Sequence, residues 1–159
     1  PDSGIAWGRW SSPVSTAGNT GFWIMDTQSD RSVALPIAGT ANYSLAGGSN
    51  PVDNHGNIGT LNSAHLRADF TNMSVQSTLN LNINGASWLA NGRGSILPGT
   101  HQFGGSYQVL KNLSPGTGEF GGVFSSTSTS GQPAGAGLGY QLQSGNSSVT
   151  GVANFGIQK

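Results

Sequence analysis

The chain has 159 residues with six basic and six acidic side chains, so its formal net charge is zero, and it contains no cysteine. This balance gives no basic surface for nucleic acid, and the lack of cysteine excludes disulfides, thiolate catalysis and cysteine-based zinc sites. No apolar run reaches the length of a membrane span. Abundant glycine, serine, threonine and asparagine with little charge is common in secreted bacterial β-proteins.

In chain order, short segments with strand-like composition alternate with turn signals, and no stretch shows helical periodicity over three turns. Two predicted strands near the middle of the chain have the clearest patterns. The other candidate strands cover residues 5–10, 21–26, 40–45, 100–109, 119–124, 137–143 and 149–155.

The clearest strand covers residues 73–83, where side chains alternate with period 2 and all odd positions except Ser77 are apolar. Period-2 alternation places one set inside and the other in water. Asn84-Gly85 follows at once and is the preferred pair for a two-residue type I′ hairpin turn. We therefore expect a shared core formed by this strand and the preceding alternating segment. Its predicted members are Met73, Val75, Leu79, Leu81, Ile83, Ala64, Leu66, Ala68 and Phe70.

Turn-rich pieces at residues 47–51, 53–56, 114–116 and 144–146 separate the strands, and residues 125–131 are predicted to form a polar loop. Glycines inside the strands mark bends, bulges or close backbone approach, which a small closed barrel needs at its corners. The pattern predicts an all-β fold: one antiparallel barrel of about eight strands with lipocalin-like closure, spanning residues 1–159. The alternative is a β-sandwich. The large aromatic side chains predict an interior that is filled rather than hollow.

The sequence offers little for catalysis, because titratable groups are few and no spacing favours a triad or a carboxylate pair. Glu119 is the only glutamate and is expected to face solvent from a strand. Asp53, Asn54 and His55 lie in an Asx- and Gly-rich stretch that fits a tight turn better than a calcium loop, which requires a bidentate glutamate. We expect no catalytic residues, no metal and no cofactor.

Recognition is expected at loops on the ends of a rigid scaffold. The candidate loops are residues 50–57, which include Asp53, Asn54 and His55, and residues 125–132. Trp10 and Trp23 are candidate exposed anchors, since exposed tryptophan dominates many protein contacts. Core packing remains the alternative for these indoles, because tryptophan also fills small β cores.

Several short motifs that contain glycine and aromatic residues follow one another along the chain. Each motif is weak evidence alone, but their order is characteristic. The motifs are Trp7-Gly8-Arg9-Trp10 and residues 43–48, 50–51, 59–61, 68–70, 103–104, 118–122, 134–140 and 149–155. This order resembles the β-barrel domains of transferrin-binding-protein-B-like surface proteins. It looks closer still to barrels appended to bacterial proteins with a ferric-citrate-regulator-type domain.

The resemblance implies an antiparallel barrel of about eight strands in a Gram-negative envelope protein, and it attaches no catalytic set to these motifs. Residues 125–132 interrupt the late motif, so the register of that strand pair is left open. Iron or transferrin binding does not carry over, since partner contacts in such proteins lie in variable loops.

The function expected from the sequence is a non-catalytic interaction module of an exported protein at the cell surface, in the periplasm or outside the cell. The partner is expected to be a protein, with self-association as a further expectation. Two alternatives remain: a self-assembling subunit of an extracellular matrix or filament, and a lipocalin-like carrier of a small ligand. Pro1 is interpreted as the edge of a processed or excised fragment.

Overall fold

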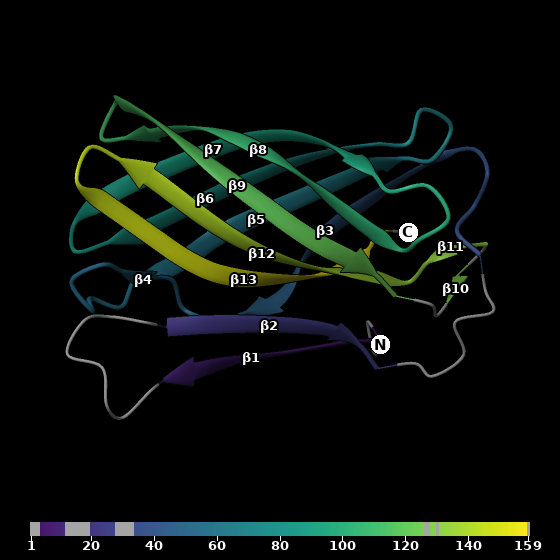
Figure 1. Cartoon of the computed structure of the whole chain (residues 1–159), viewed down its shortest axis with the longest axis horizontal. Coiled ribbons are helices and arrows are strands. Elements are labelled where there is room, and N and C mark those ends of the chain that lie inside the picture. Colours follow the sequence, from purple (N-terminus) through teal and green to yellow (C-terminus); the bar gives the residue numbers. More distant parts are fainter. Residues whose placement is uncertain (1–3, 12–19, 28–33, 126–127, 130, 159) are drawn as a thin grey trace.

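The computed structural model describes residues 4–11, 20–27, 34–125, 128–129 and 131–158, with backbone alone at residues 9–11, 20–22 and 128–129. All regular secondary structure in these ranges is β-strand (Figure 1). The strands are β1 (Ile5–Ser11), β2 (Thr20–Asp26), β3 (Thr40–Gly48), β4 (Val52–Asp53), β5 (Thr60–Asp69), β6 (Ser74–Ile83), β7 (Ala86–Ile96), β8 (Gln102–Lys111), β9 (Ser114–Phe124), β10 (Ser128–Thr129), β11 (Gln132–Pro133), β12 (Gly135–Ser144) and β13 (Ser147–Ile157).

Eight antiparallel strands close into a barrel, as the sequence predicts. The hydrogen-bonded order is β3-β5-β6-β7-β8-β9-β12-β13, and β13 pairs back with β3 to complete the ring. Each of these eight strands therefore lies beside the next strand of the ring along the chain. The short β4 pairs with β13 outside the ring. Closure leaves no free edge in the ring, because each of the eight strands has a neighbour on both sides.

The two ends of the barrel carry different connections (Figure 1). Three two-residue turns lie at one end, here called the tight-turn end: Asn84-Gly85, Asn112-Leu113 and Gly145-Asn146. The opposite end, here called the cleft end, carries the β5–β6 and β7–β8 connections, the β10–β11 hairpin and residues 34–39. Antiparallel strands require this arrangement, since successive connections alternate between the two ends.

The core lies inside the barrel and is formed by alternate residues of its strands. Along β6, Val75, Ser77, Leu79, Leu81 and Ile83 are buried while most of the residues between them are exposed. The predicted partners Ala64, Leu66, Ala68 and Phe70 are buried beside them, which confirms the predicted core. Met73 is the exception among the predicted members: it is only partly buried.

Met73 differs from its predicted place because it precedes β6 and adopts a positive φ of 50°. A residue in that conformation turns the chain at the start of the strand and does not continue the alternation. Asn84 and Gly85, with φ of 49° and 77°, form the predicted tight turn.

Aromatic side chains occupy much of the barrel interior. Phe124 lies at the centre of a cluster near the cleft end, with ring centroids 4.6 Å from Phe103, 5.6 Å from Phe70 and 5.9 Å from Tyr43. Tyr107 continues this packing, and its hydroxyl lies 2.7 Å from Ser77 Oγ. Side chains thus fill the barrel, as predicted for a small barrel with many aromatics.

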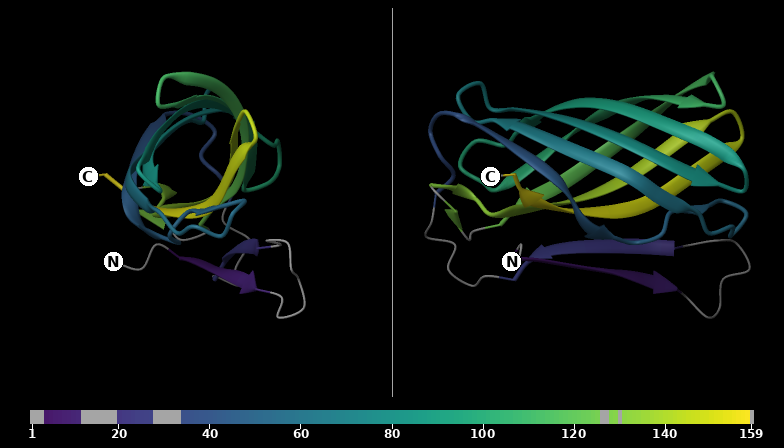
Figure 2. Two further views of the ribbon diagram at one scale, coloured as in Figure 1. Left: turned by 90° about the vertical axis from the view of Figure 1, so that its left-hand side faces the viewer. Right: turned by 180° about the vertical axis from the view of Figure 1, so that it is seen from behind.

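Strands β1 and β2 form a separate hairpin on the outer face of the barrel (Figure 2). They pair with each other and with no other described strand. Ile5 and Ile24 lie against Gly137 of β12, where an added Cβ would meet the Cγ2 atoms of both isoleucines. Gly137 is therefore a point of close approach between two layers, one of the roles predicted for strand glycines.

The turn predicted at residues 114–116 is wrong by two positions. Asn112 and Leu113, with φ of 46° and 70°, make the turn, and Ser114 already pairs with Lys111 as the first residue of β9. Pro115 is tolerated in the strand because the pairing of β9 with β12 starts only at Thr117. The missing N–H of the proline is therefore not needed by a ladder on that side.

The polar loop predicted at residues 125–131 is wrong at its first residue, Ser125. Ser125 is buried, its N–H donates to Gly135 O, and its Oγ accepts from Gly135 N. Residues 128–129 of the predicted loop form β10, which pairs with β11 just after the loop in a small hairpin. The register left open by the sequence is continuous, from Ala136 opposite Phe124 to Gln143 opposite Thr117.

Candidate functional site: an apolar cleft at one end of the barrel

An open cleft of about 940 Å³ lies at the cleft end, between the barrel and the end of β2. Four segments and one residue of β9 build it: residues 24–26 of β2, residues 34–37, the β5–β6 connection, residues 99–102 and Val123. They converge because strand β2 ends beside the barrel opening, where these connections also lie. The barrel thus brings together residues from separate segments that no common sequence motif connects.

The rim of this cleft is apolar and exposed. Ile37 has 95% of its surface accessible and Met25 has 54%, while Leu35 and Met73 are partly buried against the core. Phe70, which belongs to the buried aromatic cluster, lies at the base. Exposed apolar side chains that gather around a concave surface are typical of a binding site rather than of random surface variation.

Polar side chains make up a third of the residues that line the same cleft: Asp26, Thr71, Thr100, His101 and Gln102. Asp26 and His101 both contribute to the lining, and each takes part in an interaction with another group of the protein. Thr100 is held by its own turn, because its Oγ1 donates to Leu97 O and accepts from Gln102 N. The cleft therefore combines apolar side chains available for contact with polar side chains that can orient a bound group.

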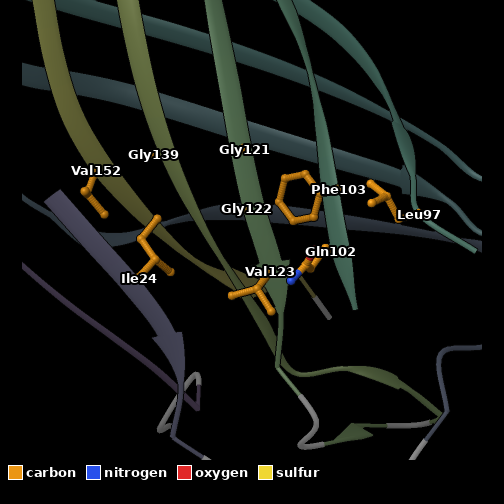
Figure 3. Close-up of a pocket in the computed structure, with 9 residues that line it drawn as sticks. All are labelled: Ile24, Leu97, Gln102, Phe103, Gly121, Gly122, Val123, Gly139 and Val152. Atoms are coloured by element: carbon orange, nitrogen blue, oxygen red, sulfur yellow. The ribbon is translucent and has the colours of Figure 1, made fainter. Parts of the chain in front are cut away.

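A smaller cleft of about 420 Å³ adjoins the first one on the outer face of the barrel (Figure 3). Its floor is glycine from β9 and β12, including Gly121 and Gly139, and its sides are Ile24, Leu97 and Val123. Ile24, Gln102 and Val123 line both clefts. The hairpin therefore forms one wall of a concave surface that runs from the barrel side to the barrel end.

Trp23, one of the two predicted tryptophan anchors, is not among the described residues that line the cleft. Trp23 is half-buried on β2 and lies against Gly8 of the paired strand, so that it contributes to packing within the hairpin. Trp10 belongs to β1, opposite Gly21, and its side chain lies outside the described part of the structure. Met25, two residues after Trp23, supplies exposed apolar surface on this strand.

Asp53 and Asn54 hold a turn at the tight-turn end, far from the cleft. Asp53 Oδ1 accepts from the N–H groups of His55 and Asn57, and Oδ2 accepts from the Asn57 side chain. Slight burial acts to raise the pKa of Asp53, but these hydrogen bonds from Asn57 and His55 outweigh it and lower the pKa. The tight turn that the sequence predicts for this stretch is thus confirmed.

Asn54 fastens this turn to β13. Its Oδ1 accepts from Ser148 N and its Nδ2 donates to Asn146 O, both in or beside the last tight turn. His55 is exposed. The two candidate loops, residues 50–57 and 125–132, lie at opposite ends of the barrel and cannot form one site.

The tight-turn end also holds a cation inside the barrel mouth. Lys111 Nζ donates to Ser147 Oγ at 2.6 Å and lies 5.4 Å from the centre of the Trp88 ring. This side chain connects β8 with β13, which are not neighbours in the barrel. The contact combines a hydrogen bond with a cation–π interaction, so it ties this end of the barrel together.

Residues important to the cleft are missing from the sequence-based candidates. Met25 and Ile37 lack the tryptophan or charge that marks a recognisable site, and their partners at residues 70–73 and 99–102 belong to other parts of the chain. One signal was present: the apolar run at residues 33–38 lies between strand-like segments, where polar turn residues would be expected.

Among the described residues, no three histidine or acidic side chains come together to hold a metal ion. The same part of the chain contains no helix of sufficient length and hydropathy to cross a membrane. No protein-family model matches the chain, and a comparison with curated proteins finds no significant relative.

Proposed function

We propose that this chain is a non-catalytic interaction module that binds an apolar segment of a partner protein in the cleft at the end of its barrel. The observation that carries the proposal is the exposed apolar rim, above all Ile37 and Met25, around a concavity of about 940 Å³. Such exposure is unfavourable unless a partner covers it. The filled interior favours binding at the barrel end over the carrier alternative, in which a small ligand would lie within the barrel.

The setting proposed for this module is the bacterial cell envelope, in a protein exported to the surface, periplasm or medium. This part of the proposal is supported by the low charge and the abundance of small polar residues. The order of glycine and aromatic motifs, which resembles transferrin-binding-protein-B-like barrels, also supports it. Only the barrel architecture is carried over from that resemblance, and no iron-related ligand is proposed.

Selection from a library of random linear peptides tests the binding function, with the immobilised full chain as bait. We expect enriched peptides to share apolar side chains, and a Met25→Asp/Ile37→Asp double variant to bind them at least about tenfold more weakly, because a carboxylate would face the apolar ligand. Ile58→Asp is the matched control: Ile58 is 62% exposed but lies outside the cleft, so binding should be unchanged. Failure to enrich any peptide, or equal binding by both variants, would contradict the proposal.

A further inference from the structure

Leu113 is the most unusual residue at the tight-turn end. It occupies the second position of a two-residue turn with φ of 70°, a conformation that disfavours a leucine side chain, and 85% of its surface is exposed. At the same end, Asn84-Gly85 makes a two-residue turn with glycine in the equivalent position. Leu113 thus carries both a backbone and a solvation cost, a combination that marks functional rather than structural residues.

Leu113 is not an isolated apolar residue. Leu110 and Leu89 lie directly opposite each other on the outer face of β8 and β7, and they are 41% and 40% exposed. We call Leu89, Leu110 and Leu113 the apolar knob. The next outward row across the strands, Asn91, Gln108 and Thr117, is polar but uncharged. Nothing in this row would repel an apolar, neutral partner, and no cation there favours an anionic lipid surface.

The cleft at the opposite end offers what the knob lacks. It is concave, its rim is apolar, and its volume of about 940 Å³ is far larger than a leucine side chain. The β8–β9 turn and the cleft lie at opposite ends of the barrel (Figure 1), so that one molecule cannot bring them together. A second copy placed end to end with the first can do so.

We propose that this chain self-associates head to tail, with the apolar knob of one copy inserted into the cleft of the next. This inference rests on the proposed function, because it names the partner of the same cleft. The occupant is a second copy rather than an unrelated protein, since both complementary surfaces are present on one chain. Contacts of this kind do not close on themselves unless the rotation makes a ring, so they extend into open chains. The zero net charge adds little long-range repulsion between copies.

Two variants with blocked surfaces test this arrangement. Leu113→Asn removes the most exposed side chain of the apolar knob but keeps the turn, because asparagine tolerates positive φ. The Met25→Asp/Ile37→Asp variant blocks the cleft. Sedimentation velocity over a range of concentrations should show the unchanged chain growing past the dimer, and each variant dissociating at least about tenfold more readily. Leu113→Met and Ile58→Asp are the controls and should associate like the unchanged chain.

Mixing the two variants distinguishes head-to-tail contact from a symmetric dimer. In an equimolar mixture, the intact cleft of Leu113→Asn can accept the intact knob of the cleft variant, so we expect a heterodimer that does not grow further. A chain that stays monomeric at all concentrations would overturn the inference. Association that stops at a dimer, or a mixture that does not form the heterodimer, would overturn it as well.

Peptide binding separates the failure of this inference from the failure of the proposed function. The Leu113→Asn variant retains its cleft and should bind the selected apolar peptides as the unchanged chain does, and those peptides should dissolve the assemblies. If the unchanged chain is monomeric yet binds the peptides at the cleft, self-association is wrong and the binding function stands. If it neither associates nor binds peptides, both proposals are wrong.

Discussion

The barrel and the β1–β2 hairpin are built from the same kind of strand but are stabilised differently. Each barrel strand has two hydrogen-bonded neighbours and one face in the core, whereas β1 and β2 pair only with each other among the described strands. The hairpin is attached through side chains such as Ile5 and Ile24 on the outer face of β12. Closed strand ladders resist local opening, so we expect the hairpin to detach at a lower free energy than barrel unfolding requires.

Tryptophan positions make this difference measurable. Trp88 is buried in the barrel, whereas Trp7, Trp10 and Trp23 belong to the hairpin strands. Fluorescence of a Trp88→Phe variant therefore reports on the hairpin and on its docking to the barrel, since Trp7 lies against Gly47 of β3. A variant with phenylalanine at the other three positions reports on the barrel.

The largest expected effect is that of alkaline pH on the barrel. Burial raises the pKa of Tyr43, Tyr107 and Tyr140 in the folded chain, so these groups keep protons that the unfolded chain loses above about pH 10. Their contribution to stability is complete below that pH and is lost as the pH rises further. The free energy of unfolding is expected to fall by about 1.4 kcal/mol per tyrosine for each pH unit.

Urea unfolding at a series of alkaline pH values, followed with Trp88, measures this slope. A Tyr140→Phe variant is the control and should show a slope smaller by the share of one tyrosine. An unfolding free energy that stays constant above pH 10 would contradict the prediction.

The second-largest effect is expected for shortening a buried core side chain. Leu81 is fully buried on β6, and Leu81→Ala is expected to lower the free energy of unfolding by about 2–5 kcal/mol through the cavity it leaves. Leu110→Ala, on the outer face of the barrel, should cost less than about 0.5 kcal/mol. Denaturant unfolding of both variants checks the difference, and equal effects would mean that Leu81 is not part of a packed interior.

Glycine substitutions on β12 act on the hairpin and leave the barrel intact. Gly137→Ala places a methyl group against Ile5 and Ile24, and it is expected to weaken hairpin docking by about 1–3 kcal/mol. Gly139→Ala is the matched control, because its added Cβ would lie 3.7 Å from Ile24 Cδ1, an ordinary contact. Red-shifted fluorescence in the Trp88→Phe background should appear for the first variant only. A lower unfolding midpoint of the barrel itself would show that the two regions are not separable.

The smallest effect is expected for the connection between β9 and β12. Deletion of residues 127–130 leaves Ser125 and its bonds to Gly135 in place, so the unfolding free energy should change by less than about 0.5 kcal/mol. Deletion that includes Ser125 should cost more, since it removes a buried hydrogen-bonded residue. Thermal unfolding of the two deletions compares them, and equal midpoints would show that Ser125 is dispensable.

Local patterns predicted most of the barrel but little of the cleft. The alternation along β6 and the Asn84-Gly85 turn follow from rules that act over a few residues. The turn at Leu113 escaped prediction because leucine rarely adopts positive φ, and the nearby Pro115-Gly116 gave a stronger turn signal. Asp53 and Asn54 were recognised as turn formers, but their distance from the cleft depends on which end of the barrel each connection reaches.

The sequence by itself determined an all-β chain with a filled core, because side-chain alternation and turn residues express preferences of the local backbone. Only the tertiary structure decided that residues 24–26, 34–37, 70–73 and 99–102 meet in one cleft while the β8–β9 turn, with its exposed Leu113, lies at the far end. It also decided that the first two strands stay outside the ring. These outcomes depend on barrel closure, in which β13 pairs with β3 across about a hundred residues of chain, and no local pattern encodes the position of the partner strand.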